Sequence, residues 1–357
     1  MAEGRRSPLT RADVLRLIEE NGGKAEGLDL SGKRFEERVD LRGLNLEGVI
    51  LKWAVFTPSY KGVVEGARLQ NANLKRAQLQ EAHLVAAELQ LANLDRAQLQ
   101  EADLAAANLE GASLVETQLQ EAKLVGARLD KAWLSLAQLE GANLTTATLR
   151  KAHLEGANLG AANLSYADLE GVTLADRQVT LAGAQFSSDT RLESVHWGDY
   201  VLGEEEAILD EGIESYRRLK QWYTNAGMYQ IAGKFFYREM EARRKSRRWK
   251  VEPHLKLWDC ILRLLCGYGE KAERVVVSAL VLILGLAMTY FFLGAFRSTT
   301  FAGCLYYSVV SFTALGYAGW VYPEPASWAK GLGAAQAVLG VFMMALFLVT
   351  FTRKMTR

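Results

Sequence analysis

The chain of 357 residues carries 42 basic and 41 acidic side chains, a formal net charge of +1, and half of its residues are hydrophobic. This near-neutral charge averages dissimilar parts of the chain. Nothing beside its one strongly basic run supports base recognition, so we expect no nucleic-acid partner. Three cysteines and four histidines, with no CxxC pair or His cluster, argue against a disulfide framework and predict no metal site or cofactor. No Ser/His/Asp grouping or phosphate-binding Gly loop is recognisable, so we do not expect an enzyme.

The N-terminal segment, residues 1–27, is polar with the spacing of an amphipathic helix. It has no apolar stretch of the kind that a cleavable export signal requires. We therefore expect everything before the first membrane span to fold in the cytoplasm.

A five-residue period dominates the first half of the chain. From Leu69 to Leu174 every fifth residue is Leu, 22 times in succession, and the residue two positions earlier is Ala in 20 of the 22 repeats. A period of five fits neither a helix nor a strand. It predicts a chain that turns a corner after each repeat, buries the Leu and Ala side chains, and stacks coil upon coil as a solenoid.

This A-x-L-x-x pattern resembles the pentapeptide-repeat family. The resemblance implies a right-handed quadrilateral β-helix with four repeats per coil. A weaker register through Leu41, Leu46, Leu51 and Phe56 extends the expected solenoid to residues 28–200, with a loop inserted at 57–62. Its charges are spread over every face, so we expect a structural or protein-binding rod.

A helical hairpin is expected next, at residues 201–252, where Leu219, Tyr223, Ala232 and Phe236 have helical spacing. The pattern resembles one tetratricopeptide hairpin and serves equally well as a connector. Near the end of this hairpin lies a basic run: Arg243, Arg244, Lys245, Arg247, Arg248 and Lys250. Because the run closely precedes a membrane span, we expect it to contact lipid headgroups. Residues 253–271 then predict an interfacial helix along the inner leaflet.

Two uncharged stretches of 22 residues, 275–296 and 331–352, are long enough to cross a bilayer as helices. Basic residues collect before the first stretch and after the second. The positive-inside rule therefore predicts a multi-pass protein of the cell (inner) membrane with both termini and the solenoid in the cytoplasm.

The connection between the spans contains the run YYSVVSFTALGY, residues 306–317. The run resembles the pore loop of the potassium-channel superfamily, and with its flanking spans residues 272–357 resemble the two-helix pore domain. The resemblance implies a pore helix and filter over 299–319, a homotetramer around one axis, and a monovalent cation, K⁺ or Na⁺, bound by filter carbonyls. The implied filter is Thr313, Ala314, Leu315, Gly316, Tyr317 and Ala318.

Three positions depart from the family pattern. Ala314 replaces the Thr whose hydroxyl forms the innermost ion site, Ala318 replaces a Gly, and Gly319 replaces an Asp. Potassium selectivity and nonselective cation conduction therefore both stay open. The literal Gly267-Tyr268-Gly269 motif precedes the first span, so we interpret it as a turn.

Two residues of the second span invite a pore role. Gly340, near its middle, is a candidate gate hinge or an ordinary packing glycine, and Gln336 should face the pore or another helix rather than lipid. The overall expectation is an all-α pore domain with a re-entrant loop, joined to a cytoplasmic solenoid that regulates it or docks a protein partner. The competing reading is a non-conducting, membrane-anchored scaffold.

Overall fold

The computed structural model describes residues 7–56, 66–174, 179, 181, 183–197, 209–247, 252–296, 300–313 and 326–355, with 209–211 and 353–355 described by their backbone alone. The chain divides into two compact units, Met1–Arg218 and Leu219–Arg357. Each unit is described by itself.

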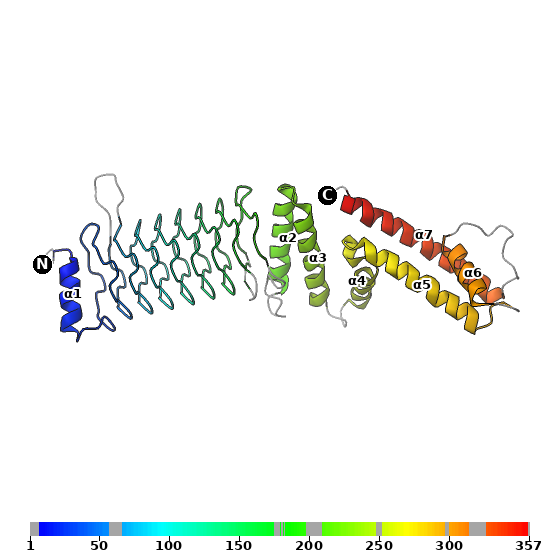
Figure 1. Cartoon of the computed structure of the whole chain (residues 1–357), viewed down its shortest axis with the longest axis horizontal. Helices are drawn as coiled ribbons and strands as arrows, with labels where there is room; N and C mark the ends of the chain where they lie inside the picture. The colour runs from blue at the N-terminus through cyan, green and yellow to red at the C-terminus, as the bar shows by residue number, and fades with distance from the viewer. Residues whose placement is uncertain are drawn as a thin grey trace. The chain divides into compact units, whose positions relative to one another are not determined.

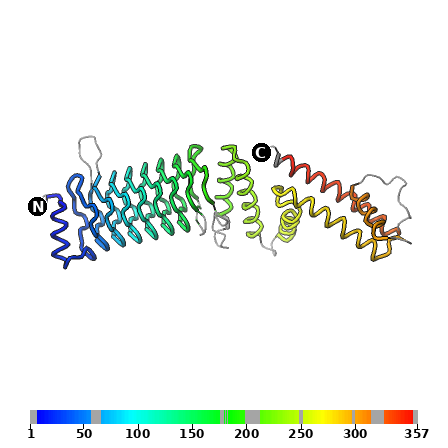
Figure 2. The backbone as a smooth tube through the Cα atoms, in the orientation of Figure 1, coloured from blue at the N-terminus to red at the C-terminus, as the bar shows by residue number. Residues whose placement is uncertain are grey.

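Most of the first unit is a stack of coils, seen as the repeating loops of Figures 1 and 2. Parallel β-bridges join residues 20 positions apart, and four of them complete one coil, as in Arg68–Glu88, Asn73–Asn93, Gln78–Gln98 and His83–Asp103. The pairing is regular: the backbone N–H of Leu74 donates to Asn93 at 2.7 Å, and that of Asn93 donates back to Ala72 at 2.9 Å. Four pentapeptides per coil thus follow directly from the bridges.

Within the described ranges the pairing consists of isolated β-bridges, and no continuous β-strand is formed there. The strand content and right-handedness of the expected β-helix therefore remain predictions. Bridges also connect Asn45 with Asn73 and Val55 with His83, across a 28-residue separation. The weaker register before residue 57 thus continues the stack, while the expected loop at 57–62 lies outside the described residues.

The core of the stack is made by the two periodic positions. The Leu and Ala columns are buried from Ala67 to Leu174, with Thr117 and Val172 equally buried in the Ala column. At the corners the chain turns through positive φ, for example 56° at Arg76. A Cβ makes this conformation costly by about 1 kcal/mol, and the corner N–H of Arg76 offsets part of that cost by donating to Asp95 on the next coil at 2.9 Å.

Both ends of the stack are covered. Helix α1 (Arg11–Glu20) begins at a capping box of Thr10 and Asp13, buries Val14, and anchors to the first coil where Arg11 donates to the carbonyl of Asp40 at 2.6 Å. At the other end Ser215 of helix α2 (Leu209–Asn225) donates to the carbonyl of Leu181 at 3.1 Å. Covering the terminal coils removes open edges that would otherwise pair with other chains.

The solenoid core allows a direct stability test. Leu104 of the Leu column is fully buried, whereas Leu91, at a corner of a coil, is 64% exposed. We expect Leu104→Ala to lower the free energy of unfolding by about 2–5 kcal/mol, because it leaves a cavity among the stacked leucines, and Leu91→Ala to change it by less than about 0.5 kcal/mol. Chemical denaturation followed by circular dichroism measures both, and equal losses would contradict the buried ladder.

The second unit is helical. It contains the end of α2, α3 (Tyr229–Ser246), α4 (Pro253–Cys266), the single turn η1 (Gly267–Gly269), α5 (Ala272–Phe292), α6 (Phe301–Thr313) and α7 (Ser327–Met355). Stacked Tyr223 and Phe235 pack α2 against α3, with ring centroids 5.5 Å apart. Helices α5, α6 and α7 pack together (Figure 1).

The expected helices are present with shifted boundaries. The two spans correspond to α5 and to residues 327–352 of α7, both apolar enough to cross a membrane by length and composition. Helix α6 begins at Phe301, in the stretch from residue 299 where the sequence predicts a pore helix. Gly267–Gly269 forms the single turn η1, in keeping with its interpretation as a turn.

Candidate pore region

Helix α6 has 13 residues and is therefore about 20 Å long, too short to cross a hydrocarbon core of about 30 Å. It lies between α5 and α7, both of which are long enough. A short apolar helix held between two spans has the dimensions of a helix that enters a membrane without leaving it on the far side.

A buried polar network connects the three helices through Gln336 of α7. The Nε2 of Gln336 donates to the backbone carbonyl of Ser308 at 3.0 Å and to its Oγ at 2.7 Å. The same Oγ donates to the carbonyl of Ile283 on α5 at 2.8 Å, and the hydroxyl of Tyr290 donates to Oε1 of Gln336 at 3.2 Å. One amide thus joins all three helices, where an apolar environment leaves such groups no alternative partner in water.

Aromatic packing holds the middle of α6, at Tyr307. Tyr307 meets Tyr290 and Phe296 edge-to-face, with centroids 5.2 Å away in both cases. Its hydroxyl donates to the carbonyl of Ala329 at the start of α7, at 3.2 Å. Tyr307 is therefore fixed both by ring geometry and by a hydrogen bond.

Close contact with α7 holds the C-terminal end of α6. A Cβ built on Gly340 would lie 1.8 Å from the carbonyl oxygen of Phe312 and 2.7 Å from its carbonyl carbon. Phe312 itself packs in a buried cluster with Cys266, Val275 and Met343. Only glycine permits this approach, so Gly340 positions the end of α6 whether or not it also serves as a hinge.

Of the six residues in the predicted filter, Thr313 alone belongs to the described residues. It is the last residue of α6, and its hydroxyl donates to the carbonyls of Val309 and Val310 at 2.9 and 3.3 Å. The C-terminal end of a helix carries a partial negative charge that favours a nearby cation. Ala314, Leu315, Gly316, Tyr317 and Ala318 lie outside the described residues.

Gln336, predicted to face the pore or another helix, is buried and contacts α5 and α6 of its own chain. The sequence indicated only that Gln336 is an amide residue within an apolar span. It did not indicate which residues the amide would contact. Ser308 and Tyr290 are functional candidates that the pattern did not single out, since hydroxyl residues are common in membrane helices.

Three of the six residues of the basic run form ion pairs within the protein. Arg243 pairs with the buried Glu239 at 2.6 Å, Arg244 pairs with Glu241 at 3.2 Å, and Arg247 pairs with the buried Asp259 of α4. Lys245 is exposed, and Arg248 and Lys250 lie outside the described residues. A headgroup role for these six residues stays a prediction, and for three of them it competes with contacts inside the protein.

The polar side of α4 faces α3. Lys256 donates to the carbonyl of Arg247 at 2.6 Å, and Arg263 pairs with Glu241 at 2.7 Å. The exposed side of α4 carries apolar side chains: Leu257, Trp258 and Leu264. This arrangement suits a helix that meets a membrane with its apolar side, while its charged side chains bind α3 and the residue that follows it.

The turn η1 follows α4 directly, and two buried side chains lie at this point, Cys266 and Tyr268. Burial raises the pKa of the Tyr268 hydroxyl to about 12, with the nearby Glu241 carboxylate adding to the rise. Burial likewise raises the pKa of the Cys266 thiol. Both groups therefore stay protonated near neutral pH, and neither has the character of a reactive nucleophile. Among the described residues no group of His, Cys, Asp and Glu side chains is arranged to hold a metal ion.

The network around Gln336 predicts a measurable stability loss. Gln336→Leu preserves the volume but leaves Ser308 and Tyr290 without their amide partner, so we expect about 1–3 kcal/mol of destabilisation. Thermal unfolding of the detergent-solubilised full chain measures this variant against the unaltered protein. An unchanged transition in Gln336→Leu would show that the network contributes nothing.

Family comparisons cover both halves of the chain. Residues 65–97, 97–135 and 137–175 match a family described as pentapeptide repeats, and residues 277–357 match a family described as ion channel. Among proteins with curated descriptions, none matches this chain.

Several solved structures resemble the repeat part. HetL, a pentapeptide repeat protein involved in heterocyst differentiation regulation from Nostoc sp. strain PCC 7120, is 22% identical over 54% of this chain and 97% of its own, with a TM-score of 0.22. Rfr23 from Cyanothece 51142 is 30% identical over 46% of this chain and 91% of its own, with a TM-score of 0.17. QnrB1, a plasmid-mediated fluoroquinolone resistance protein, is 23% identical over 45% and 83%, with a TM-score of 0.22. At these TM-scores the likenesses add nothing to what the coils themselves show.

Proposed function

We propose that four copies of this chain assemble into a cation channel whose solenoid is a cytoplasmic docking or regulatory domain. The chain joins pentapeptide repeats to an ion-channel domain. The observation that carries the proposal is the position of α6. This short helix is fixed between two membrane-length helices by Gln336 and Tyr307, and it ends just before residues 314–318.

One chain supplies one α6 and one connection between α6 and α7, which cannot surround an ion by itself. Filters of this kind are built from rings of backbone carbonyls, so several copies must share an axis. The wide apolar exposure of α5 and α7 supports both lipid and subunit contacts: Val281, Phe292, Val338 and Val349 are all more than half exposed in the single chain.

The proposal has two versions, a potassium-selective channel and a nonselective cation channel. Thr313 and the run through Gly316 and Tyr317 favour potassium by resemblance. Ala314, Ala318 and Gly319 favour the nonselective version, because they remove a hydroxyl ligand, a flexible glycine and a carboxylate from the family pattern. We place the protein in the cell membrane with its solenoid and both termini in the cytoplasm, on the distribution of basic residues around the spans.

The solenoid supports protein docking better than nucleic-acid binding. Its exposed arginines are partly neutralised, as where Arg96 pairs with Glu116 at 3.0 Å and Arg191 pairs with Asp168 at 2.7 Å. Trp133 is half exposed and stacks on the partly buried His153, with ring centroids 4.1 Å apart. Exposed tryptophan is typical of protein contact sites.

Cation flux into proteoliposomes tests the conducting function. The full chain is reconstituted, and uptake of K⁺ or Na⁺ is followed with a fluorescent indicator against empty liposomes. We expect protein-dependent uptake of at least one of the two ions. Absence of uptake of both ions by an intact oligomer would favour the membrane-anchored scaffold, in which the spans only tether the solenoid.

A further inference from the structure

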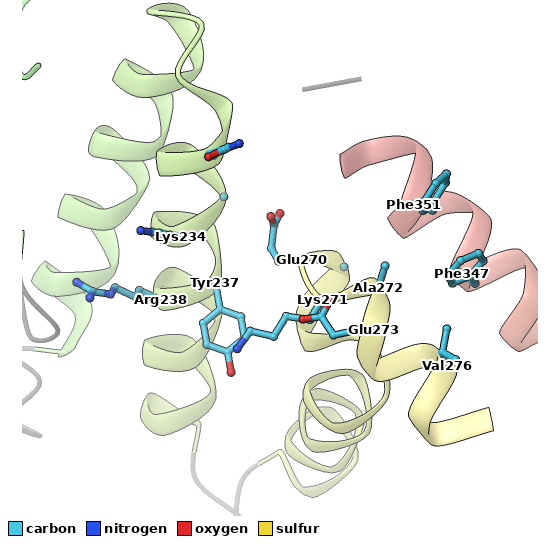
Figure 3. Close-up of a pocket in the computed structure, with 13 residues that line it drawn as sticks. Lys234, Tyr237, Arg238, Glu270, Lys271, Ala272, Glu273, Val276, Phe347 and Phe351 are labelled. Carbon is cyan, nitrogen blue, oxygen red and sulfur yellow. The ribbon is translucent and has the colours of Figure 1, made fainter. Parts of the chain in front are cut away.

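A large cavity lies beside the ends of the two membrane helices, on the side of α3. Its volume is about 950 Å³, and it is bounded by α3, by the residues between η1 and α5, and by the last turns of α7 (Figure 3). The size falls at the upper end of small-molecule sites, which occupy about 300–1,000 Å³.

The walls of this cavity differ in character. Val276, Phe347 and Phe351 supply an apolar wall from α5 and α7, while Glu270, Lys271 and Glu273 supply charged groups at the start of α5. Lys234 and Arg238 of α3 also line the cavity, but in Figure 3 their side chains extend away from the space between α3 and α7, whereas Glu270 extends into it. The Nζ of Lys271 lies 5.1 Å from the centroid of the Tyr237 ring. The cavity thus offers two carboxylates and one ammonium group above an apolar wall.

The apolar wall continues into a second cavity. Val276 and Phe347 also line a space of about 330 Å³ that is bounded entirely by apolar residues, among them Ala279, Met343 and Leu348. With α5 and α7 crossing the bilayer, as proposed above, the second cavity lies within the depth of the hydrocarbon core, because its residues belong to the apolar stretches of these helices. The first cavity lies where α5 begins at Ala272 and where the span in α7 ends at Thr352, which is the level of the headgroups.

We propose that the two cavities together bind one phospholipid of the surrounding bilayer with a zwitterionic, primary-amine headgroup, that is, phosphatidylethanolamine. Lys271 receives the phosphate, Glu270 and Glu273 receive the ammonium group, and one acyl chain enters the apolar cavity past Val276 and Phe347. A charged rim that opens onto an apolar space at headgroup depth fits an amphiphile, whose polar and apolar parts meet at that depth.

The headgroup follows from the balance of charges. Glycerol headgroups carry no cation and would bring a phosphate close to two carboxylates. Choline carries a cation but no N–H donor, so it cannot form charge-assisted hydrogen bonds with Glu270 or Glu273. The ethanolamine ammonium group can donate hydrogen bonds to both carboxylates, and its phosphate lies next to Lys271. This site does not depend on conduction, because it would bind lipid equally in a channel or in a membrane-anchored scaffold.

Native mass spectrometry of the full-length oligomer, with synthetic phospholipids that share the same acyl chains, tests the proposal. We expect the ethanolamine lipid to bind about tenfold more tightly than the choline or glycerol lipid at one site per chain. Val276→Phe narrows the passage between the cavities and should weaken binding about tenfold. Val281→Phe is the matched control, since Val281 is 65% exposed on the same helix and lines neither cavity, and it should bind as the unaltered protein does.

A second pair of variants tests the headgroup without changing the packing. The double substitution Glu270→Gln with Glu273→Gln should erase the preference for ethanolamine over glycerol, whereas Lys33→Gln on the solenoid should leave it intact. If Val276→Phe fails to assemble, this pair decides the question. Equal binding of all three headgroups by the unaltered protein, or a preference that survives the double substitution, would overturn the proposal, as would the absence of bound lipid because a neighbouring copy fills the cavity.

Discussion

Substituting Gly340 by alanine is expected to separate α7 from α6 and to abolish cation flux. The added Cβ would sit 1.8 Å from the carbonyl oxygen of Phe312. Neither atom can rotate aside, because the Cβ is fixed to the backbone of α7 and the oxygen belongs to the backbone of α6. Overpacking of this kind costs about 1–3 kcal/mol or more. Because Phe312 is adjacent to Thr313, any displacement of the α6 end moves the first residue of the predicted filter. Flux and oligomer stability, measured on the same preparation, report the two effects.

Two glycines of the same membrane helices serve as controls. A Cβ on Gly331 of α7 or on Gly285 of α5 meets nothing within 4 Å inside the chain. Alanine is a better helix former than glycine by about 1 kcal/mol, so Gly331→Ala and Gly285→Ala should be neutral or slightly stabilising. If Gly340→Ala behaves like these two, the close contact between α6 and α7 does not exist in the assembled protein.

Loss of conduction without loss of assembly is expected for Gly316→Ala. Gly316 lies outside the described residues, and its role follows from the resemblance of residues 306–317 to a potassium-channel pore loop. A methyl group at this position would restrict the backbone whose carbonyls are proposed to replace the hydration shell of the ion. We expect flux to fall at least about tenfold, which corresponds to about 1.4 kcal/mol in the barrier.

The distinction between these two glycine variants is diagnostic. Gly340→Ala should alter both oligomer stability and flux, whereas Gly316→Ala should leave the size-exclusion profile and the thermal transition unchanged. Unchanged flux in Gly316→Ala would show that residues 313–318 do not line the conducting path.

The architecture was largely predictable because its two main signals are periodic or long. The recurrence of Leu at every fifth residue predicts coils made of pentapeptides. The bridges between residues such as Asn73 and Asn93 join successive coils of this kind. Likewise, an uncharged stretch of 22 residues has few alternatives to a span. These features depend on local repetition or composition, which a single sequence displays directly.

The contacts that position α6 were less predictable, because they join residues far apart in the chain. Nothing near Gln336 indicates that its partner is Ser308, 28 residues earlier, or that Gly340 admits Phe312. The basic run shows the same limitation. Its charges predicted lipid contacts, yet Arg243 and Arg247 find carboxylates on α3 and α4, and Asp259 lies 12 residues beyond its arginine. Pairing across helices depends on their packing, which charge patterns alone do not encode.

Single-channel recording of the full-length protein in a planar bilayer tests the central claim most directly. With KCl on one side and NaCl on the other at equal concentration, a selective channel should give unitary currents that reverse far from zero voltage, and a nonselective cation channel should reverse near zero. A KCl gradient then identifies the carrier, and we predict reversal towards the potassium equilibrium potential. Reversal at the chloride potential, or no unitary current from an intact oligomer, would contradict the proposal that this protein is a cation channel.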